Sequence, residues 1–214
     1  MELEGKKINF LGDSITQGVG ASDVNKTHFI ALMRESLHLA AARNYGISGT
    51  RIARQLHPEG DPYAGKDFCA RYAGMDDDAD IVVVFGGTND FGHGDAHLGR
   101  FTDRGDDTFY GACHTLFAGL CRKYPRATIV VVTPTHRLDE FAQQKTTEPL
   151  VDYVRAEREV AEYYSLPVLD LYAVSGIQPE IPELRELYMP DGLHPSDAGH
   201  ARIAERLTAF LRAL

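Results

Sequence analysis

Four short segments of the sequence carry side chains of the types used in nucleophilic catalysis. They are the segments 12–14 (GDS), 44–50 (NYGISGT), 86–90 (GGTND) and 191–195 (DGLHP). A serine hydroxyl becomes a good nucleophile only when a base removes its proton, and an imidazole is the usual base near neutral pH. A carboxylate is then needed to fix the imidazole tautomer and to stabilise the imidazolium ion.

Ser14, His194 and Asp191 supply these three groups. Asp191 and His194 are three residues apart on a predicted turn, so they can meet without help from a distant strand. Pro195 restricts the backbone conformation of His194, the residue before it. We therefore predict Ser14 as the nucleophile, His194 as the base and Asp191 as the carboxylate that orients the base.

The same segments offer hydrogen-bond donors for an oxyanion. Hydrolysis through a tetrahedral intermediate needs donors that are already aimed at the oxygen on which charge develops. The backbone N–H groups of Ser14 and Gly49 are two candidates, and the side-chain amide of Asn89 is a third. Gly49 suits this role because it has no side chain to block a close approach.

Each segment taken alone also has a purely structural explanation. Asp13 or Ser14 could cap a helix, because both residue types are preferred at helix N-termini. The glycines of 44–50 could serve a tight turn, and Asn89 and Asp90 are common turn residues. Only the joint occurrence of the four segments favours a catalytic site.

The elements between these segments indicate how the chain brings them together. Nearly continuous apolar runs predict buried parallel strands at 7–12, 80–87, 127–134 and 166–171, with a weaker candidate at 39–46. Helical periodicity is found at 28–40, 107–124, 148–165 and 196–214. Strand and helix alternate, which predicts an α/β domain with a central parallel sheet covered on both faces. The four segments follow strands or precede the last helix, and ligands of such sheets gather at the carboxyl ends of the strands.

The composition limits the classes of partner. The chain has 214 residues, of which 43% are hydrophobic, and its net charge is -9. An acidic surface repels phosphate backbones, so no nucleic-acid partner is expected. No segment is apolar over the length of a membrane span and no signal peptide is visible, so we expect a cytoplasmic protein. Of the three cysteines, Cys113 and Cys121 are expected to be small buried residues, and the oligomeric state cannot be read from the sequence.

In their order, GDSIT, the glycine of NYGISGT, GTND and DGLHP resemble the four blocks of the SGNH hydrolase superfamily, also called the GDSL esterase/lipase family. The four letters fall on Ser14, Gly49, Asn89 and His194, with Asp191 as the third triad member. The resemblance implies a flavodoxin-like three-layer α/β/α sandwich with about five parallel strands, and a single SGNH-hydrolase-like domain over residues 1–214. It also implies hydrolysis of esters or thioesters without a metal or an organic cofactor. Thr16 stands where the Gly-x-Ser-x-Gly elbow of α/β-hydrolases needs glycine.

The substrate is less well defined by the sequence. The loops after the strands are polar, so we expect a small acyl ester, with a short acyl chain such as acetyl, on a carbohydrate among other alcohols. Asp13, His93 and His136 are expected on the substrate side of the site. A lysophospholipase, a thioesterase or an acyltransferase with the same triad stays open. So does a non-catalytic flavodoxin-like ligand-binding module, although no Gly-x-Gly-x-x-Gly and no Walker lysine motif is present.

Three other parts of the sequence contain histidines that could belong to a functional site. Asp197 and His200 form a second Asp-x-x-His, but they overlap the last helix, and we expect them to have structural roles. His93, Asp95 and His97 alternate like metal ligands, yet the surrounding 91–107 is typical of an exposed loop. We expect a loop on the substrate side and keep a metal site as the less favoured alternative. His136 is equally consistent with a pocket residue and with a solvent-facing one.

Overall fold

The computed structural model describes residues 1–141 and 148–214. At its centre, five parallel strands are arranged in the order β2-β1-β3-β4-β5, which is the flavodoxin-like order. The strands are β1 (Lys7–Gly12), β2 (Ala41–Gly46), β3 (Ile81–Phe85), β4 (Thr128–Val132) and β5 (Val168–Leu169). All five lie within the runs predicted from the sequence, so the predicted fold class is confirmed.

The burial of the strands explains how clearly each one appears in the sequence. All five residues of β3 are buried. Ile81, Val83 and Phe85 belong to the hydrophobic cluster on one face of the sheet, and Val82 and Val84 belong to the cluster on the other. A strand covered on both faces needs no polar alternation. The edge strand β2 is only half-buried, which is why its segment gives a weaker signal.

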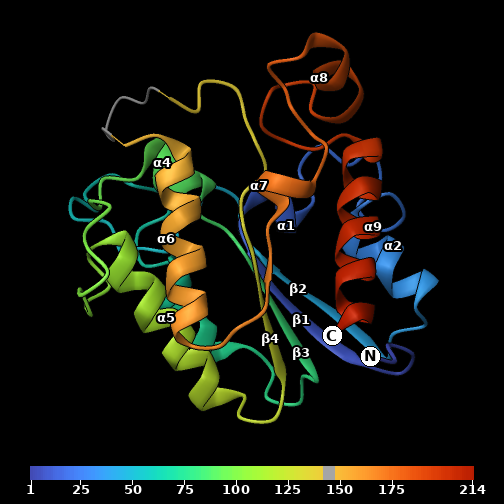
Figure 1. Cartoon of the computed structure of the whole chain (residues 1–214), viewed down its shortest axis with the longest axis horizontal. Coiled ribbons are helices and arrows are strands. Elements are labelled where there is room, and N and C mark those ends of the chain that lie inside the picture. Colours follow the sequence, from blue (N-terminus) through green and yellow to red (C-terminus); the bar gives the residue numbers. More distant parts are fainter. Residues whose placement is uncertain (142–147) are drawn as a thin grey trace.

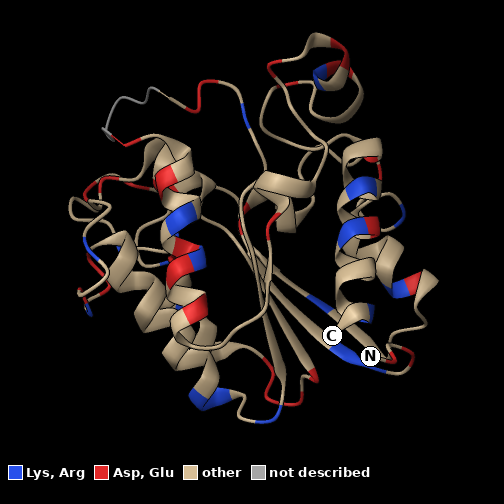
Figure 2. Ribbon diagram, viewed as in Figure 1, with Lys and Arg blue, Asp and Glu red and all other residues tan. Residues whose placement is uncertain are grey.

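Four long helices cover the sheet and confirm the three-layer arrangement. Figure 1 shows α5 and α6 on one side of the sheet and α2 and α9 on the other. Figure 2 shows acidic and basic residues along α6 and α9 and in the connecting loops, whereas β3 and β4 carry none. The long helices match the predicted ones and span α2 (Phe29–Ser36), α5 (Phe109–Lys123), α6 (Leu150–Tyr163) and α9 (Asp197–Ala213).

Apart from a possible helix capped by Asp13 or Ser14, the short helices were not predicted, because three to seven residues are too few to show an apolar period. They are α1 (Ser14–Gln17), α3 (Phe68–Arg71), the 3₁₀ helix η1 (Tyr72–Gly74), α4 (Thr88–His93), α7 (Leu171–Val174) and α8 (Pro182–Tyr188). Within the described residues, no helix is both long enough and apolar enough to cross a membrane.

Helix α4 corrects one expectation about the segment 91–107. Phe91 is fully buried and packs edge-on against Tyr153, with 6.0 Å between the ring centroids. The first part of the segment therefore belongs to the core, and the exposed loop begins only after Ala96, which is also buried. Cys113 is buried as expected, whereas Cys121 is half-buried.

The core on the α5 side should be sensitive to loss of volume. Phe117 of α5 is fully buried, whereas Phe141 is 73% exposed. We expect Phe117→Ala to lower the free energy of unfolding by about 3–5 kcal/mol, because it removes a large buried side chain and leaves a cavity. The matched change Phe141→Ala should cost about 0.5 kcal/mol or less. Urea unfolding of both variants measures the difference, and equal effects would contradict this packing.

Candidate active site

The turn after β1 places Ser14 at the first position of α1. The strand ends at Gly12, where an added Cβ would lie 1.9 Å from the Thr16 hydroxyl oxygen, so the turn closes too tightly for any side chain there. The Asp13 carboxylate accepts a hydrogen bond from the Ile15 N–H at 2.9 Å and thereby caps α1. The cap of the helix is therefore Asp13, and Ser14 is left free for other contacts.

The side chain of Asp13 is buried next to this turn. Its side chain was expected on the substrate side, but it is only 2% exposed. Burial raises the pKa of the Asp13 carboxyl to about 6, although the hydrogen bond from the Ile15 N–H and the electrostatic effects of His194 and Arg71 oppose this rise. Asp13 thus stabilises the start of α1 through its hydrogen bond with Ile15.

Ser14, His194 and Asp191 form a continuous chain of hydrogen bonds. The Asp191 Oδ2 lies 2.7 Å from the His194 Nδ1, and the His194 Nε2 lies 3.0 Å from the Ser14 Oγ. A carboxylate can only accept, so the Nδ1–H of His194 donates to Asp191. In the neutral imidazole the Nε2 lone pair then faces the serine, and the Ser14 hydroxyl donates to it.

The loop that carries Asp191 and His194 is held by its own backbone. The Asp191 Oδ1 accepts hydrogen bonds from the N–H groups of Leu193 at 2.9 Å and His194 at 2.6 Å. Partial burial tends to raise the pKa of Asp191, but the hydrogen bonds from the His194 backbone and imidazole outweigh it and hold this pKa below its ordinary value. Asp191 therefore stays ionised beside the imidazole.

Gly49 and Asn89 arrive from the two strands that flank β1. Gly12 pairs with Gly46 of β2 and with Phe85 of β3, so the loops after both strands start beside the Ser14 turn. Gly49 has a φ of +75°, a conformation that favours glycine. The Asn89 Nδ2 donates to the carbonyl of Thr50 at 3.0 Å, which ties Asn89 to the Gly49 loop and leaves its second amide hydrogen for another acceptor.

Asp90 holds the loop that carries Gly49 by hydrogen bonds to its backbone, a role that the sequence analysis did not predict. Its carboxylate accepts from the backbone N–H groups of Ile52 and Ala53, each at 2.9 Å. Burial raises the pKa of Asp90 to about 7, against the effect of these hydrogen bonds. The two partners lie 37 and 38 residues away in the chain, so only the GTND motif itself could have pointed to this residue.

Arg71 is a second residue that the sequence analysis missed. Its Nη2 donates to the carbonyl of Gly12 at 2.6 Å and to the Thr50 hydroxyl at 3.0 Å. Its Nη1 donates to the carbonyl of Tyr45 in β2. Burial lowers the pKa of Arg71 to about 10, with the charges of nearby Asp13 and Asp67 opposing this. One guanidinium thus links the ends of β1 and β2 to the Gly49 loop.

The histidines expected near the substrate have other partners. The His93 Nδ1 lies 3.0 Å from the Arg51 Nη1. The His136 Nδ1 lies 3.0 Å from a carboxylate oxygen of Glu140, and its ring lies against that of Tyr172.

The side chains of His93 and Asp95, in the segment that alternates like metal ligands, have other partners. The Asp95 carboxylate accepts from the backbone N–H groups of Leu56 and His57, and the His97 side chain is exposed. Over residues 1–141 and 148–214, no group of three or more His, Cys, Asp or Glu side chains could hold a metal ion. Asp95 thus holds the loop after α4 against the backbone of Leu56 and His57.

His200 has the structural role expected for the second Asp-x-x-His. It is fully buried and packs edge-on against His28 with 4.9 Å between ring centroids, behind α1. The His200 Nε2 lies 3.3 Å from the Val19 carbonyl, and the His28 Nε2 lies 3.2 Å from the Ile15 carbonyl. Burial lowers the pKa of each to about 4, so both imidazoles are neutral at pH 7 and support the backbone around the Ser14 helix.

Comparison with known proteins gives consistent matches over nearly the whole chain. The model of the GDSL-like lipase/acylhydrolase family matches residues 10–202. A GDSL lipase from Mycobacterium tuberculosis is 27% identical over 217 residues, which cover 95% of this chain and 80% of that protein. A crystal structure of a protein from Lactobacillus plantarum is 30% identical, with a TM-score of 0.85 and coverage of 99% of this chain and 98% of that one. A two-domain esterase active on acetylated mannans shares the fold at 22% identity, with a TM-score of 0.62 and coverage of 98% of this chain and 50% of that one.

The buried histidines should make stability depend on pH. The folded-state pKa of His200 is about 4 and its ordinary value is 6.5, so the unfolded chain binds the extra proton between these values. Its contribution to stability is complete above pH 6.5 and is lost as the pH falls towards 4. We expect the difference in unfolding free energy between the wild type and His200→Gln to shrink by about 1.4 kcal/mol per pH unit in this window.

This difference is measured by urea unfolding at pH 7, 6, 5 and 4.5. Taking the difference between two proteins cancels the carboxyl groups that titrate in both. His97→Gln, at an exposed position, is the control for loss of an imidazole. A difference for His200→Gln that stays constant with pH would show that His200 is not held neutral by burial.

Proposed function

The chain belongs to the GDSL-like lipase/acylhydrolase family, and from that premise we propose that it hydrolyses carboxylic esters with Ser14 as nucleophile, His194 as general base and Asp191 as the residue that orients His194. The hydrogen-bonded chain Ser14 Oγ–His194 Nε2–His194 Nδ1–Asp191 carries this proposal, at 3.0 Å and 2.7 Å. These hydrogen bonds connect the three groups in the order that a serine nucleophile needs. The lone pair of the neutral His194 imidazole faces the Ser14 hydroxyl.

In the first half of the proposed reaction, the Ser14 Oγ attacks the carbonyl carbon of the ester while the His194 Nε2 takes the hydroxyl proton. The carbonyl π electrons move to oxygen, which becomes the oxyanion of a tetrahedral intermediate. The N–H groups of Ser14 and Gly49 and the Asn89 side-chain amide donate to this oxyanion. Asp191 stabilises the imidazolium ion without taking its proton.

In the second half, the intermediate collapses and the bond to the alcohol oxygen breaks. His194 gives its proton to that oxygen, so a neutral alcohol leaves and an acyl-Ser14 ester remains. A water molecule then attacks the acyl carbon while His194 takes one of its protons. The second collapse returns this proton to the Ser14 Oγ and releases the carboxylic acid.

We propose short-chain acyl esters as substrates, with acetyl groups on carbohydrates as the first candidates. The segments around the triad are polar, and a long acyl chain would have to displace water from them without replacing its hydrogen bonds. The acetylated-mannan esterase that shares this fold suggests the same compounds for a first test. Lysophospholipids, acyl thioesters and acceptor alcohols belong in the same substrate panel, because the triad itself does not distinguish among them.

We further propose that residues 1–214 act as one domain. The hydrophobic clusters on the two faces of the sheet share its strands, since β3 and β4 each contribute alternate residues to both. The proposed triad also needs both ends of the sequence, because Ser14 follows β1 and His194 precedes α9.

Removal of the nucleophile gives the most direct test. Ser14→Ala should lower kcat on p-nitrophenyl acetate by several orders of magnitude, because it removes the hydroxyl that lies 3.0 Å from the His194 Nε2. A fluorophosphonate probe should label the wild type at Ser14, as found by peptide mass spectrometry. Ser36→Ala, at an exposed position of α2, is the matched control and should keep full activity and labelling. Full activity in Ser14→Ala would refute the assignment of the nucleophile.

The contribution of Asn89 can be separated from binding. Asn89→Ala should lower kcat by about 10²–10³-fold with a small change in KM, because its amide is expected to donate mainly when the oxyanion forms. Asn25→Ala, in an exposed loop, is the control. Urea unfolding of the variant reports whether loss of the Asn89–Thr50 hydrogen bond alters the fold. A stable variant with unchanged kcat would remove Asn89 from the proposed oxyanion hole.

A further inference from the structure

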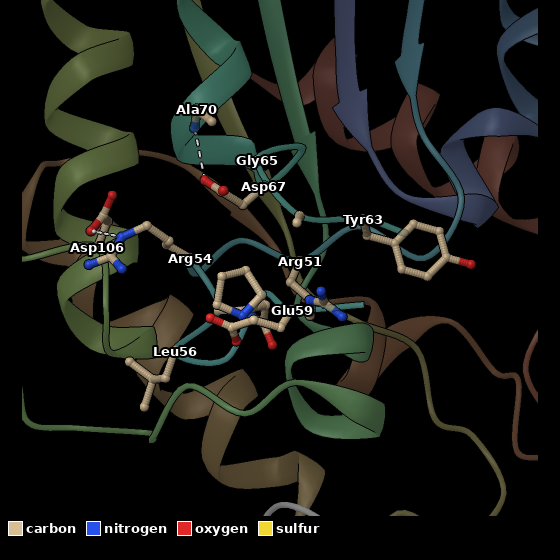
Figure 3. Close-up of a pocket in the computed structure, with 12 residues that line it drawn as sticks. Arg51, Arg54, Leu56, Glu59, Tyr63, Gly65, Asp67, Ala70 and Asp106 are labelled. Atoms are coloured by element: carbon tan, nitrogen blue, oxygen red, sulfur yellow. Dashed lines mark hydrogen bonds and ion pairs between the residues drawn. The ribbon is translucent and has the colours of Figure 1, made fainter. Parts of the chain in front are cut away.

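Two adjoining cavities lie beside the loop that carries Gly49. Their volumes are about 500 Å³ and 320 Å³, and the residues that line both are Arg51, Gln55, Glu59 and Tyr63. Figure 3 shows the larger one, with the Arg54–Asp106 pair at one side of the labelled residues and Tyr63 at the other. Most of the walls come from the segment 51–67, between β2 and α3.

The smaller cavity borders the proposed oxyanion donors. A Cβ added at Gly49 would lie 2.2 Å from the Cζ of Tyr63, so the tyrosine ring rests directly on the Cα of Gly49. His93 also lines this cavity, with its ring centroid 6.1 Å from that of Tyr63. His93 follows Asn89 by four residues on α4, and residues four apart lie on the same face of a helix. A substrate held by Gly49 and Asn89 therefore has these cavities next to it.

Most of the charged side chains in the walls are already paired. Arg51, which is 4% exposed, contacts Asp61 and His93. Arg54 pairs with Asp106 at 3.0 Å, and His57 pairs with Asp95 at 3.2 Å. The exception is Glu59, which is exposed and has no hydrogen-bond or ion-pair partner among the residues that the structure describes.

The charges in the cavity walls favour binding of a neutral group that forms hydrogen bonds. An anionic group would meet the unpaired Glu59 carboxylate and the carboxylates of the pairs, and would be repelled. An alkyl chain can contact the apolar part of the walls, which includes Leu56, Pro58 and Ala70, but it gives no hydrogen bond to Glu59 or to the paired side chains. A hydroxyl group can donate to a carboxylate and can accept from a guanidinium or an amide, so it satisfies both kinds of wall group.

We propose that these two cavities bind a neutral, hydroxyl-bearing part of the ester, and that Glu59 is the acceptor that selects it. This proposal rests on the proposed esterase function, because it places the cavities beside the oxyanion donors. It makes Glu59 a specificity-determining residue with no part in the proton transfers between Ser14 and His194.

Two pairs of esters test the proposal and distinguish the acyl side from the alcohol side. Glyceryl monoacetate and propyl acetate differ in hydroxyl groups on the alcohol, and ethyl 3-hydroxybutyrate and ethyl butyrate differ in a hydroxyl on the acyl chain. We expect the wild type to favour the hydroxylated member of at least one pair by about tenfold in kcat/KM. Glu59→Leu should lower that preference to about onefold to twofold, because it removes the acceptor for the hydroxyl group.

The control is Glu35→Leu, which makes the same change at an exposed position of α2, and it should keep the wild-type preference. A preference on the alcohol pair assigns the cavities to the leaving group, and one on the acyl pair assigns them to the acyl group. Both results support the subsite, provided that Glu59→Leu abolishes the preference. The absence of any preference, or one that Glu59→Leu leaves intact, overturns it.

Failure of the subsite and failure of the proposed function give different results. Ser14→Ala is assayed on all four esters beside the Glu59 variant. Turnover that persists in Ser14→Ala overturns the proposed function, and the subsite falls with it. Turnover that depends on Ser14 but ignores the hydroxyl groups overturns the subsite alone.

Discussion

The arrangement of the candidate site depends on one constraint, which is that β1 pairs in parallel with both β2 and β3. Gly12, at the end of β1, is in register with Gly46 and with Phe85. Three loops therefore leave the sheet at the same level and on the same edge, and they carry Ser14, Gly49 and Asn89. Chain segments up to 75 positions apart become neighbours through strand pairing alone, before any side chain of the site makes a contact.

Strand pairing brings the loops together, and buried polar groups then fix their conformation. Asp90 holds the Gly49 loop through two backbone N–H groups, and Arg71 links that loop to the ends of β1 and β2. Such loops have few backbone partners of their own, so side chains must satisfy their polar groups. Burial of a carboxyl has a cost, which is visible in the raised pKa values of Asp13 and Asp90. In return, both carboxyl groups fix the backbone of the site, Asp13 at α1 and Asp90 at the Gly49 loop.

The sequence was most informative where the signal is local. The strands β1, β3, β4 and β5 were found because their segments are short apolar runs, whereas the half-buried β2 gave only a weaker signal. Asp191 could be connected to His194 because the two are only three positions apart. The roles of Asp90, Arg71 and Tyr63 could not be predicted, since their partners lie far away in the chain and no spacing rule connects them. Asp13 illustrates a further limit, because its residue type suits both a helix cap and a pocket wall, and only its burial decides between them.

The segment between Ala53 and Phe68 has a consequence for how the protein can diversify. It supplies most of the walls of both cavities, yet the two hydrophobic clusters as described include none of its residues. Its ends are fastened independently, by Asp90 at Ile52 and Ala53 and by the Asp67 cap of α3. Inside the segment, Asp95 holds the backbone of Leu56 and His57, and the Tyr63 ring lies against Gly49. We expect changes elsewhere in the segment to alter the cavity walls rather than the sheet. The proposed subsite thus lies on a segment whose sequence can vary separately from the strands that carry the reacting groups.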